Sequence, residues 1–210
     1  MSQAKERPIL FSGHMVRAIL EGRKTVTRRA VKVQPNSKGD IGSYGLGQPF
    51  IRHPDPTKRN PECPYGRPGD RLWVRETWAQ INVAQAPEES WVVYRECDNR
   101  TDYGGPWKPS IHMRRRDSRI LLEVTDVRVE RLQDGEGETD FESRYVAEGI
   151  HRIHHGDGEH YYHPLKSEPG PGNWADPFDA WRELWVSING ADCWNANPWV
   201  WVVEFKRVQP

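Results

Sequence analysis

Apolar residues recur at helical spacing in three parts of the chain, and each part has matching start and stop signals. The first predicted helix runs between Ser12, a good N-cap, and Gly22. The second begins at a T-x-x-E capping box at 139–142 and ends at Gly149. The third opens with Asp-Pro at 176–177 and stops at Gly190; its apolar stripe is Phe178, Trp181, Leu184, Trp185 and Ile188.

Other segments alternate apolar and polar residues with a period of two, which is typical of strands. The predicted strands are 25–33, 70–79, 91–96, 119–132 and 199–205.

The strand at 119–132 contains a change of parity. Apolar residues alternate from Ile120 to Val124, and the pattern then moves to Val127 and Val129. One extra residue in a strand produces this shift, so we predict a β-bulge at Thr125-Asp126, of the kind that bends strands in small barrels.

The order of helices and strands predicts the fold class. Strands and helices do not alternate regularly, which argues against a parallel doubly wound sheet. We therefore expect one α+β domain over residues 1–210: a small mixed, mostly antiparallel β-barrel with flanking helices. Two segments without sustained periodicity, 34–70 and 151–175, are expected to be long loop insertions.

Charge and composition exclude some classes of protein. The chain has 30 Lys and Arg against 30 Asp and Glu, so no global field attracts nucleic acid and only local patches could do so. No apolar run is long enough to cross a membrane, and the N-terminus lacks the apolar core of a signal peptide, so we expect a cytoplasmic protein without a membrane partner. The three cysteines are far apart and are expected to be reduced.

The stretch "EGRKTVTRRAV" at 21–31 concentrates cations in a chain without net charge. Strand alternation places Thr25, Thr27 and Arg29 on one face, whereas Lys24 follows the turn at Gly22. One interpretation is a solvated, charged edge strand. The other is a site for an anionic or nucleotide-like ligand.

Two glutamates fall on faces that should be buried. Glu148 follows Phe141 and Tyr145 at helical spacing, and Glu76 shares a strand face with Leu72 and Val74. A buried carboxylate needs a cation or hydrogen-bond donors. The alternatives are that Glu148 points to water from a last helical turn and that Glu76 lies on a wet face or pairs with an arginine.

A basic cluster lies beside Trp107 in the segment 107–119, and its members are Lys108, His112, Arg114, Arg115, Arg116 and Arg119. Arginine and aromatic side chains together suit phosphates and stacked bases; a solvated loop is the alternative. The histidines at 151–163 lack the spacing of a metal site, and no nucleotide-binding loop or hydrolase motif occurs, so we expect neither a metal nor a cofactor.

Several stretches together resemble the ASCH domain family. They are "ILEGRKTVTRR", "GDRLWVRETW", "VAEGI" and "WVVEFKRV". The chain is also similar to the larger, Trp-rich ASCH proteins often found in phages and prophages, through "CPYGRPGDRLWVRETWA", "WKPSIHM" and "LWVSINGADCWNANPWVWVVEF". The resemblance spans nearly the whole chain and implies a PUA-like β-barrel related to RNA-binding modules.

The resemblance also implies an activity. Small bacterial ASCH proteins include amidohydrolases that deacylate N4-acetylcytidine with a Lys, a Thr and a Glu, the first two in a G-R-K-T-x-T motif. Lys24 and Thr27 take those places here, and Glu148 is the matching glutamate. An acylated nucleoside, nucleotide or modified base in nucleic acid is then the implied partner. The implied binding residues are Arg23, Arg28, Arg29, Trp73, Arg75, Glu76, Trp78, Trp107, His112, Arg114 and Arg115.

The chain departs from the small enzymes in two respects. It carries the insertions at 34–70 and 151–175, and Arg114-Arg115-Arg116 follows "WKPSIHM" where the phage-type relatives usually have Pro-Arg-Trp. Two alternatives therefore stand beside the hydrolase: a non-catalytic module that binds RNA or a modified base, and a ribonuclease that would use His112 with Lys24.

Overall fold

The structure is a computed structural model that describes residues 4–83, 86–97, 106–135 and 144–209. Its centre is a five-stranded sheet with the strand order β1-β5-β8-β11-β2. The strands are β1 (Glu6–Leu10), β2 (Val26–Ala30), β5 (Arg71–Arg75), β8 (Leu121–Arg131) and β11 (Trp199–Val208). β1 and β5 are parallel and the other pairs are antiparallel, so the expected α+β class with a mixed, mostly antiparallel sheet is confirmed.

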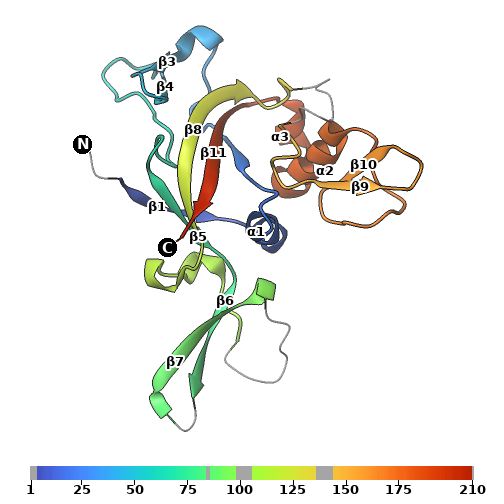
Figure 1. The fold of residues 1–210 in the computed structure, drawn as a ribbon. Helices are drawn as coiled ribbons and strands as arrows, with labels where there is room; N and C mark the ends of the chain where they lie inside the picture. The colour runs from blue at the N-terminus through green and yellow to red at the C-terminus, as the bar shows by residue number, and fades with distance from the viewer. Residues whose placement is uncertain (1–3, 84–85, 98–105, 136–143, 210) are drawn as a thin grey trace.

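Within the described residues, three hairpins and three helices surround this sheet (Figure 1). The hairpins are β3 (Ile41–Ser43) with β4 (Pro49–Ile51), β6 (Trp78–Val83) with β7 (Ala86–Tyr94), and β9 (His151–His154) with β10 (His160–His163). The helices are α1 (Gly13–Leu20), α2 (Pro177–Asn189) and α3 (Ala191–Asn195). Short 3-10 turns occur at Lys38–Asp40, Arg95–Cys97, Ser110–His112 and Arg115–Asp117.

The predicted bulge is confirmed. In the β8–β11 ladder, Glu204 pairs with Asp126 and the next residue, Phe205, pairs with Val124. Thr125 is therefore the extra residue, and both long strands curve across the molecule (Figure 1).

The described strands do not close into the expected barrel, because β1 and β2 remain the two edges of the sheet. The edges nevertheless approach each other through a side chain. Arg29 Nη2 of β2 donates to the Leu10 carbonyl of β1 at 2.8 Å. The curvature thus brings the edges together without a backbone ladder between them.

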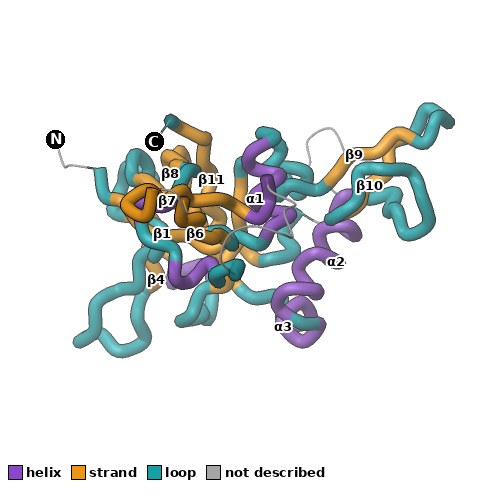
Figure 2. Tube along the Cα trace, turned by 90° about the horizontal axis from the view of Figure 1, so that it is seen from below, coloured by secondary structure: helices purple, strands orange, loops and turns teal. Residues whose placement is uncertain are grey.

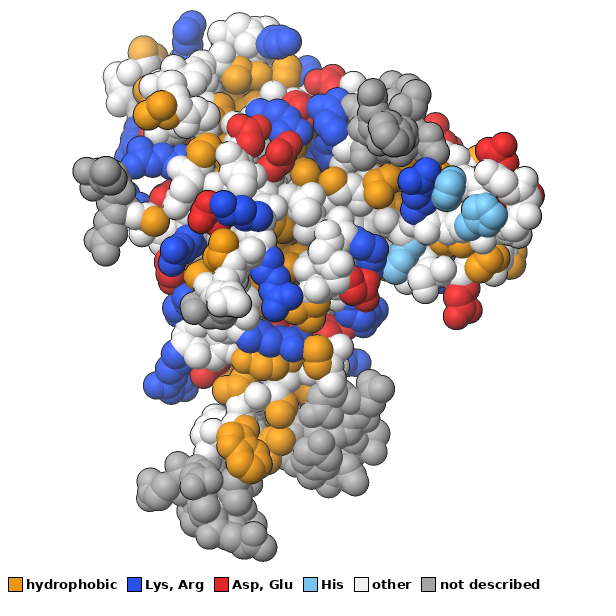
Figure 3. All heavy atoms as spheres, in the orientation of Figure 1, with side chains coloured by type: hydrophobic (Ala, Val, Ile, Leu, Met, Phe, Trp, Pro, Cys, Tyr) orange, Lys and Arg blue, Asp and Glu red, His pale blue; other side chains and the backbone are white. Residues whose placement is uncertain are grey.

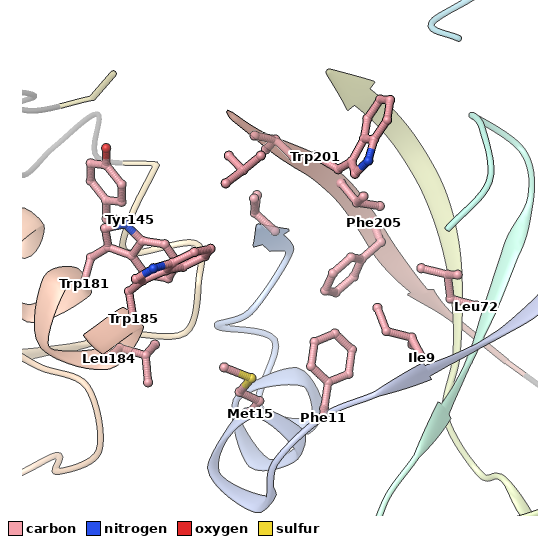
Figure 4. Packing of buried hydrophobic residues seen from close by; sticks show 14 of the residues in the cluster. Ile9, Phe11, Met15, Leu72, Tyr145, Trp181, Leu184, Trp185, Trp201 and Phe205 are labelled. Atoms are coloured by element: carbon pink, nitrogen blue, oxygen red, sulfur yellow. The ribbon is translucent and has the colours of Figure 1, made fainter. Parts of the chain in front are cut away.

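The core lies between the sheet, α1 and α2 (Figure 4). Ile9, Leu72 and Phe205 pack beneath the strands, while Trp181 and Trp185 project from α2. The predicted third helix is confirmed, because Asp176 accepts a hydrogen bond from the Phe178 backbone N–H at 2.7 Å and caps α2.

Several predicted boundaries were wrong. The strand expected at 70–79 breaks at Glu76–Thr77, and β6 leaves the central sheet to form the projecting β6–β7 hairpin (Figure 1). The two insertions contain hairpins of their own, β3–β4 and β9–β10. Of the helix expected at 139–149, residues 144–149 form turns and a β-bridge, and the capping box lies outside the described residues.

Strand β1 was not predicted. It is only five residues long and contains Pro8, which an edge strand tolerates because an edge leaves one side of its backbone unpaired. β2 is shorter than the expected strand at 25–33, and β7 begins before the expected strand at 91–96.

Candidate functional site

The cationic stretch at 21–31 and the turn at 145–148 meet directly after α1. The chain turns at Gly22, which has a φ of +77°, and Lys24 then forms an isolated antiparallel bridge with Glu148. The backbone N–H groups of Thr25 and Val26 both donate to the Ala147 carbonyl, at 2.9 and 3.1 Å. The backbone therefore fixes the position of both charged side chains.

Lys24 and Glu148 form a buried ion pair. Lys24 Nζ lies 2.7 Å from Glu148 Oε2, and the side chains are 0% and 2% exposed. Nζ also donates to the carbonyls of Val26 at 2.7 Å and Glu148 at 2.9 Å. All three protons of the lysine ammonium group therefore have acceptors.

Arg28 adds a second cation to the same carboxylate. Arg28 Nη1 donates to Glu148 Oε1 at 3.0 Å, and its guanidinium carbon lies 4.9 Å from the centre of the Tyr145 ring and 5.6 Å from that of Trp181. Two buried cations thus share one carboxylate. We call Lys24, Arg28 and Glu148 the buried cluster; it carries an excess of one positive charge when all three groups are ionised.

Burial lowers the pKa of Lys24 from its ordinary value, because the charged form loses its hydration. The Glu148 carboxylate opposes this change, whereas the cations of Arg29 and Arg28 add to it. On balance the pKa of Lys24 is lowered, so its neutral amine forms more readily than that of an exposed lysine.

Thr27 lies beside the buried cluster. It is buried in β2 and lines a cavity of about 40 Å³ between β2 and α2. Arg28, Glu148, Trp181 and Trp185 line the same cavity. Among the described residues, no hydrogen bond joins Thr27 to Lys24. The cavity has room for a few water molecules and not for a nucleobase.

The walls contributed by α2 carry unused donors. The indole N–H groups of Trp181 and Trp185 are buried, and neither has a hydrogen-bond partner in the part of the chain that the structure describes. A buried N–H without an acceptor is costly. An acceptor in the cavity, such as a water or a ligand carbonyl, would remove that cost.

The other arginines of the stretch lie at its margins. Arg23 donates to Glu21 Oε2 from Nε and to the Gly149 carbonyl from Nη1, at 2.8 and 2.6 Å. Arg29 extends towards Leu10, and its guanidinium carbon lies 5.5 Å from the centre of the Phe11 ring. These two residues support the backbone around the buried cluster.

Within the described structure, the predicted binding residues where β5 ends and β6 begins contact other protein side chains and not the buried cluster. Glu76 is 1% exposed and accepts two hydrogen bonds from Arg119, at 2.9 and 2.8 Å, as a bidentate pair. The guanidinium carbon of Arg75 lies 4.7 Å from the centre of the buried Trp73 ring. Trp78 is buried beneath Lys108, whose Nζ lies 4.8 Å from the ring centre.

The basic segment at 107–119 does not meet the buried cluster through any hydrogen bond or ion pair between described residues. His112 and Arg114 are exposed, and Trp107 is half-buried. Arg115 pairs with Glu6 of β1 at 2.5 Å. The predicted site residues of the segment 107–119 therefore lie apart from the buried cluster and Thr27.

The histidines of the second insertion gather over the β9–β10 hairpin (Figure 3). Within the described ranges, no group of three or more His, Cys, Asp or Glu side chains is placed to hold a metal ion. None of the helices among the described residues combines the length and apolar character needed to cross a bilayer.

Trp181 and Trp185 were predicted only as part of the apolar stripe of α2, and their place in the cavity wall was missed. Their sequence signal is two large amphipathic side chains on one helix face, which is also what a buried helix shows. Sequence spacing alone does not distinguish the two roles.

Comparisons of the chain with protein-family models, with curated proteins and with solved structures found no match.

Proposed function

We propose that the protein is an ASCH-type hydrolase that removes the acyl group from an N4-acylated cytidine or a similar modified base, as nucleoside, nucleotide or part of a nucleic acid. The observation that carries the proposal is the buried Lys24–Glu148 pair with Thr27 beside it. The family resemblance selected these three residues from distant parts of the chain. Their proximity supports the assignment of Lys24, Thr27 and Glu148 as catalytic residues.

The proposed chemistry begins with a neutral Lys24 amine, which burial favours. The amine accepts the proton of the Thr27 hydroxyl, and Oγ1 forms a bond with the acyl carbon. The amide C–N bond breaks, and the departing exocyclic amine takes up the proton. A water molecule then hydrolyses the acyl-threonine ester and releases the carboxylic acid and free Thr27.

Charge and donors around the cavity suit the transition state of this reaction. The tetrahedral intermediate carries a negative oxygen, which needs preorganised donors. Arg28, Trp181 and Trp185 line the same cavity, and the two indole N–H groups have no hydrogen-bond partner among the described residues. Glu148 orients the Lys24 amine through their 2.7 Å contact.

Substrate entry requires the cavity to enlarge, because its volume of about 40 Å³ is too small for a base. Trp181, Trp185 and Asn189 contribute walls from a single helix, α2. We propose that displacement of α2 opens the site and that closure excludes water during acyl transfer.

We also propose that the fold is PUA-like. The curved strands β8 and β11 and the contact of Arg29 with the Leu10 carbonyl support it, because they bring opposite edges of the sheet together.

A non-catalytic module that binds RNA or a modified base is the second candidate. The hydrogen bonds of Lys24 favour it, since all three ammonium protons are already donated and no lone pair faces Thr27 while the lysine stays charged. The buried cluster would then bind an acceptor-rich ligand without turnover. The ribonuclease alternative gains no support, because His112 is exposed and makes no hydrogen bond or ion pair with Lys24 among the described residues.

Mass spectrometry distinguishes the first two candidates. The protein and its Lys24→Met variant are incubated with N4-acylated cytidines as nucleosides, nucleotides and short oligonucleotides. The hydrolase predicts loss of the acyl group with the parent and not with the variant. Its rate should rise with pH as Lys24 loses its proton. If the protein binds members of the panel but deacylates none of them, the second candidate is favoured.

A further inference from the structure

A second polar pocket lies far from the buried cluster. It has a volume of about 210 Å³ and is formed by the start of β1, the β3–β4 hairpin and the segment 59–70. Figures 1 and 2 place β4 and α2 on opposite sides of the long strands β8 and β11. A ligand in this pocket would therefore not touch Thr27 or Glu148.

The pocket is rich in cations, although the chain as a whole is neutral. Four basic and two acidic side chains line it: Lys5, Arg7, Arg59, Arg67, Glu62 and Asp70. A second opening of about 440 Å³ shares Lys5, Arg7 and Arg59, so the basic lining continues beyond the first pocket. We call these two openings the basic groove.

The two carboxylates of the groove already have partners. Glu62 accepts hydrogen bonds from Arg59 Nη2 at 2.5 Å and from Gln48 Nε2 at 2.9 Å. Asp70 accepts from the backbone N–H groups of Lys5 at 3.0 Å and Arg67 at 3.3 Å. These carboxylates hold the walls of the groove in place and neutralise only part of its charge.

Two cations at the start of the chain, Lys5 just before β1 and Arg7 on β1, line the groove. Arg7 makes one ion pair with a described residue, between Nε and Asp70 Oδ2 at 3.9 Å, which is beyond hydrogen-bond distance, and its side chain is 37% exposed. Lys5 is exposed, and its ammonium group makes no ion pair with a described residue. Because the two residues are separated by one position on an extended chain, their side chains lie on the same face.

From these contacts we infer that the basic groove is a binding site for a phosphate group. A guanidinium and an ammonium group that line one polar cavity match the charge and the acceptor geometry of phosphate. The phosphate could belong to a polynucleotide backbone or to a mononucleotide. The groove is built largely by the insertion at 34–70, so this site is separate from the proposed hydrolase site and does not depend on its activity.

Titration of the full chain with three unmodified probes tests the inference. The probes are inorganic phosphate, cytidine monophosphate and a short fluorescent single-stranded oligonucleotide, with sodium chloride of equal ionic strength as the reference. The variants are Arg7→Gln and Lys5→Gln. The fold contacts of Lys5 use only its backbone atoms, so its substitution leaves them in place. Lys58→Gln is the matched control, because Lys58 lies in the insertion at 34–70 that builds the groove but does not line the groove itself.

We expect binding of at least one phosphate-bearing probe and a loss of about tenfold in affinity for each groove variant, since each removes a charged donor. Lys58→Gln should bind like the parent. Binding of the oligonucleotide alone assigns a backbone phosphate, whereas binding of the two small probes as well assigns a terminal one. The inference is overturned if no probe binds more than the chloride reference, or if Lys58→Gln weakens binding as much as Lys5→Gln and Arg7→Gln do.

Discussion

The ammonium group of Lys24 and the carboxylate of Glu148 lie 2.7 Å apart in the interior, although the two residues are 124 positions apart in the chain. Arg28 binds the other carboxylate oxygen at 3.0 Å. Burying such a group of charges costs desolvation energy that an apolar core would not incur. The arrangement is therefore better explained by chemistry or recognition at the adjacent cavity than by stability alone.

Replacement of Glu148 by glutamine should strongly destabilise the fold. The substitution leaves Lys24 and Arg28 as buried cations without a counter-charge, and breaking a buried pair in this way costs about 3–5 kcal/mol. The measurement is the free energy of unfolding in urea.

The matched control for this variant is Glu123→Gln. Glu123 pairs with Lys206 on the surface, where the two side chains are 32% and 60% exposed. An exposed pair contributes about 0–1 kcal/mol. Equal losses of stability in the two variants would contradict the account of the buried cluster.

Gly149→Ala should destabilise the protein through a clash beside Lys24. Gly149 has a φ of +98°, and a β-carbon there would lie 2.9 Å from Ala18 Cβ and 3.3 Å from Lys24 Cβ. Gly156 has a similar φ of +88° with nothing near its β-position, so Gly156→Ala isolates the backbone strain. We expect Gly149→Ala to cost about 1–3 kcal/mol more, as overpacking does. Equal unfolding midpoints for Gly149→Ala and Gly156→Ala would show that the packing around Lys24 has room for a β-carbon.

The stability contribution of Cys63 should decrease as the pH rises above 9. Burial raises the pKa of its thiol from an ordinary value of 9.0 to about 12. Above pH 9 the unfolded chain loses this proton while the folded chain keeps it, so rising pH favours unfolding until about pH 12. The stability advantage of the parent over Cys63→Ala should therefore narrow above pH 9, as measured by urea unfolding at several pH values. An advantage that stays constant over this pH range would contradict the burial of the Cys63 thiol.

The interaction between Glu76 and Arg119 should contribute mainly to the free energy of unfolding and not to ligand binding. Their two hydrogen bonds, at 2.9 and 2.8 Å, hold the point where β5 ends and β6 begins. In a double-mutant cycle with Glu76→Gln and Arg119→Gln, we expect a coupling energy of about 1–3 kcal/mol in unfolding. Weak coupling together with reduced ligand affinity would instead assign Glu76 to binding.

Local patterns predicted features that depend on neighbouring residues. The change of apolar parity after Val124 located the bulge at Thr125, because side-chain direction in a strand follows sequence directly. The N-cap of α2 at Asp176 followed from its side chain and the next proline.

Features that depend on distant contacts were not predictable in this way. The alternation of residues continues past Glu76 in the sequence, yet β5 ends at Arg75, and Arg119 from a distant part of the chain binds the Glu76 side chain. Of the two alternatives left open for Glu148, the buried one holds, although the helical spacing that suggested it is absent from the turns at 144–149. Its pairing with Lys24 came from family resemblance and not from periodicity.

The most direct test of the proposed chemistry compares Thr27→Val with Thr27→Ser in the acyl-cytidine assay. Valine keeps the shape of the buried side chain and removes only the hydroxyl, whereas serine keeps the hydroxyl. The account predicts deacylation by the parent, measurable deacylation by Thr27→Ser and none by Thr27→Val, with all three folded by circular dichroism. Deacylation by Thr27→Val at the parent rate, or none by the parent on any acylated cytidine, would contradict it.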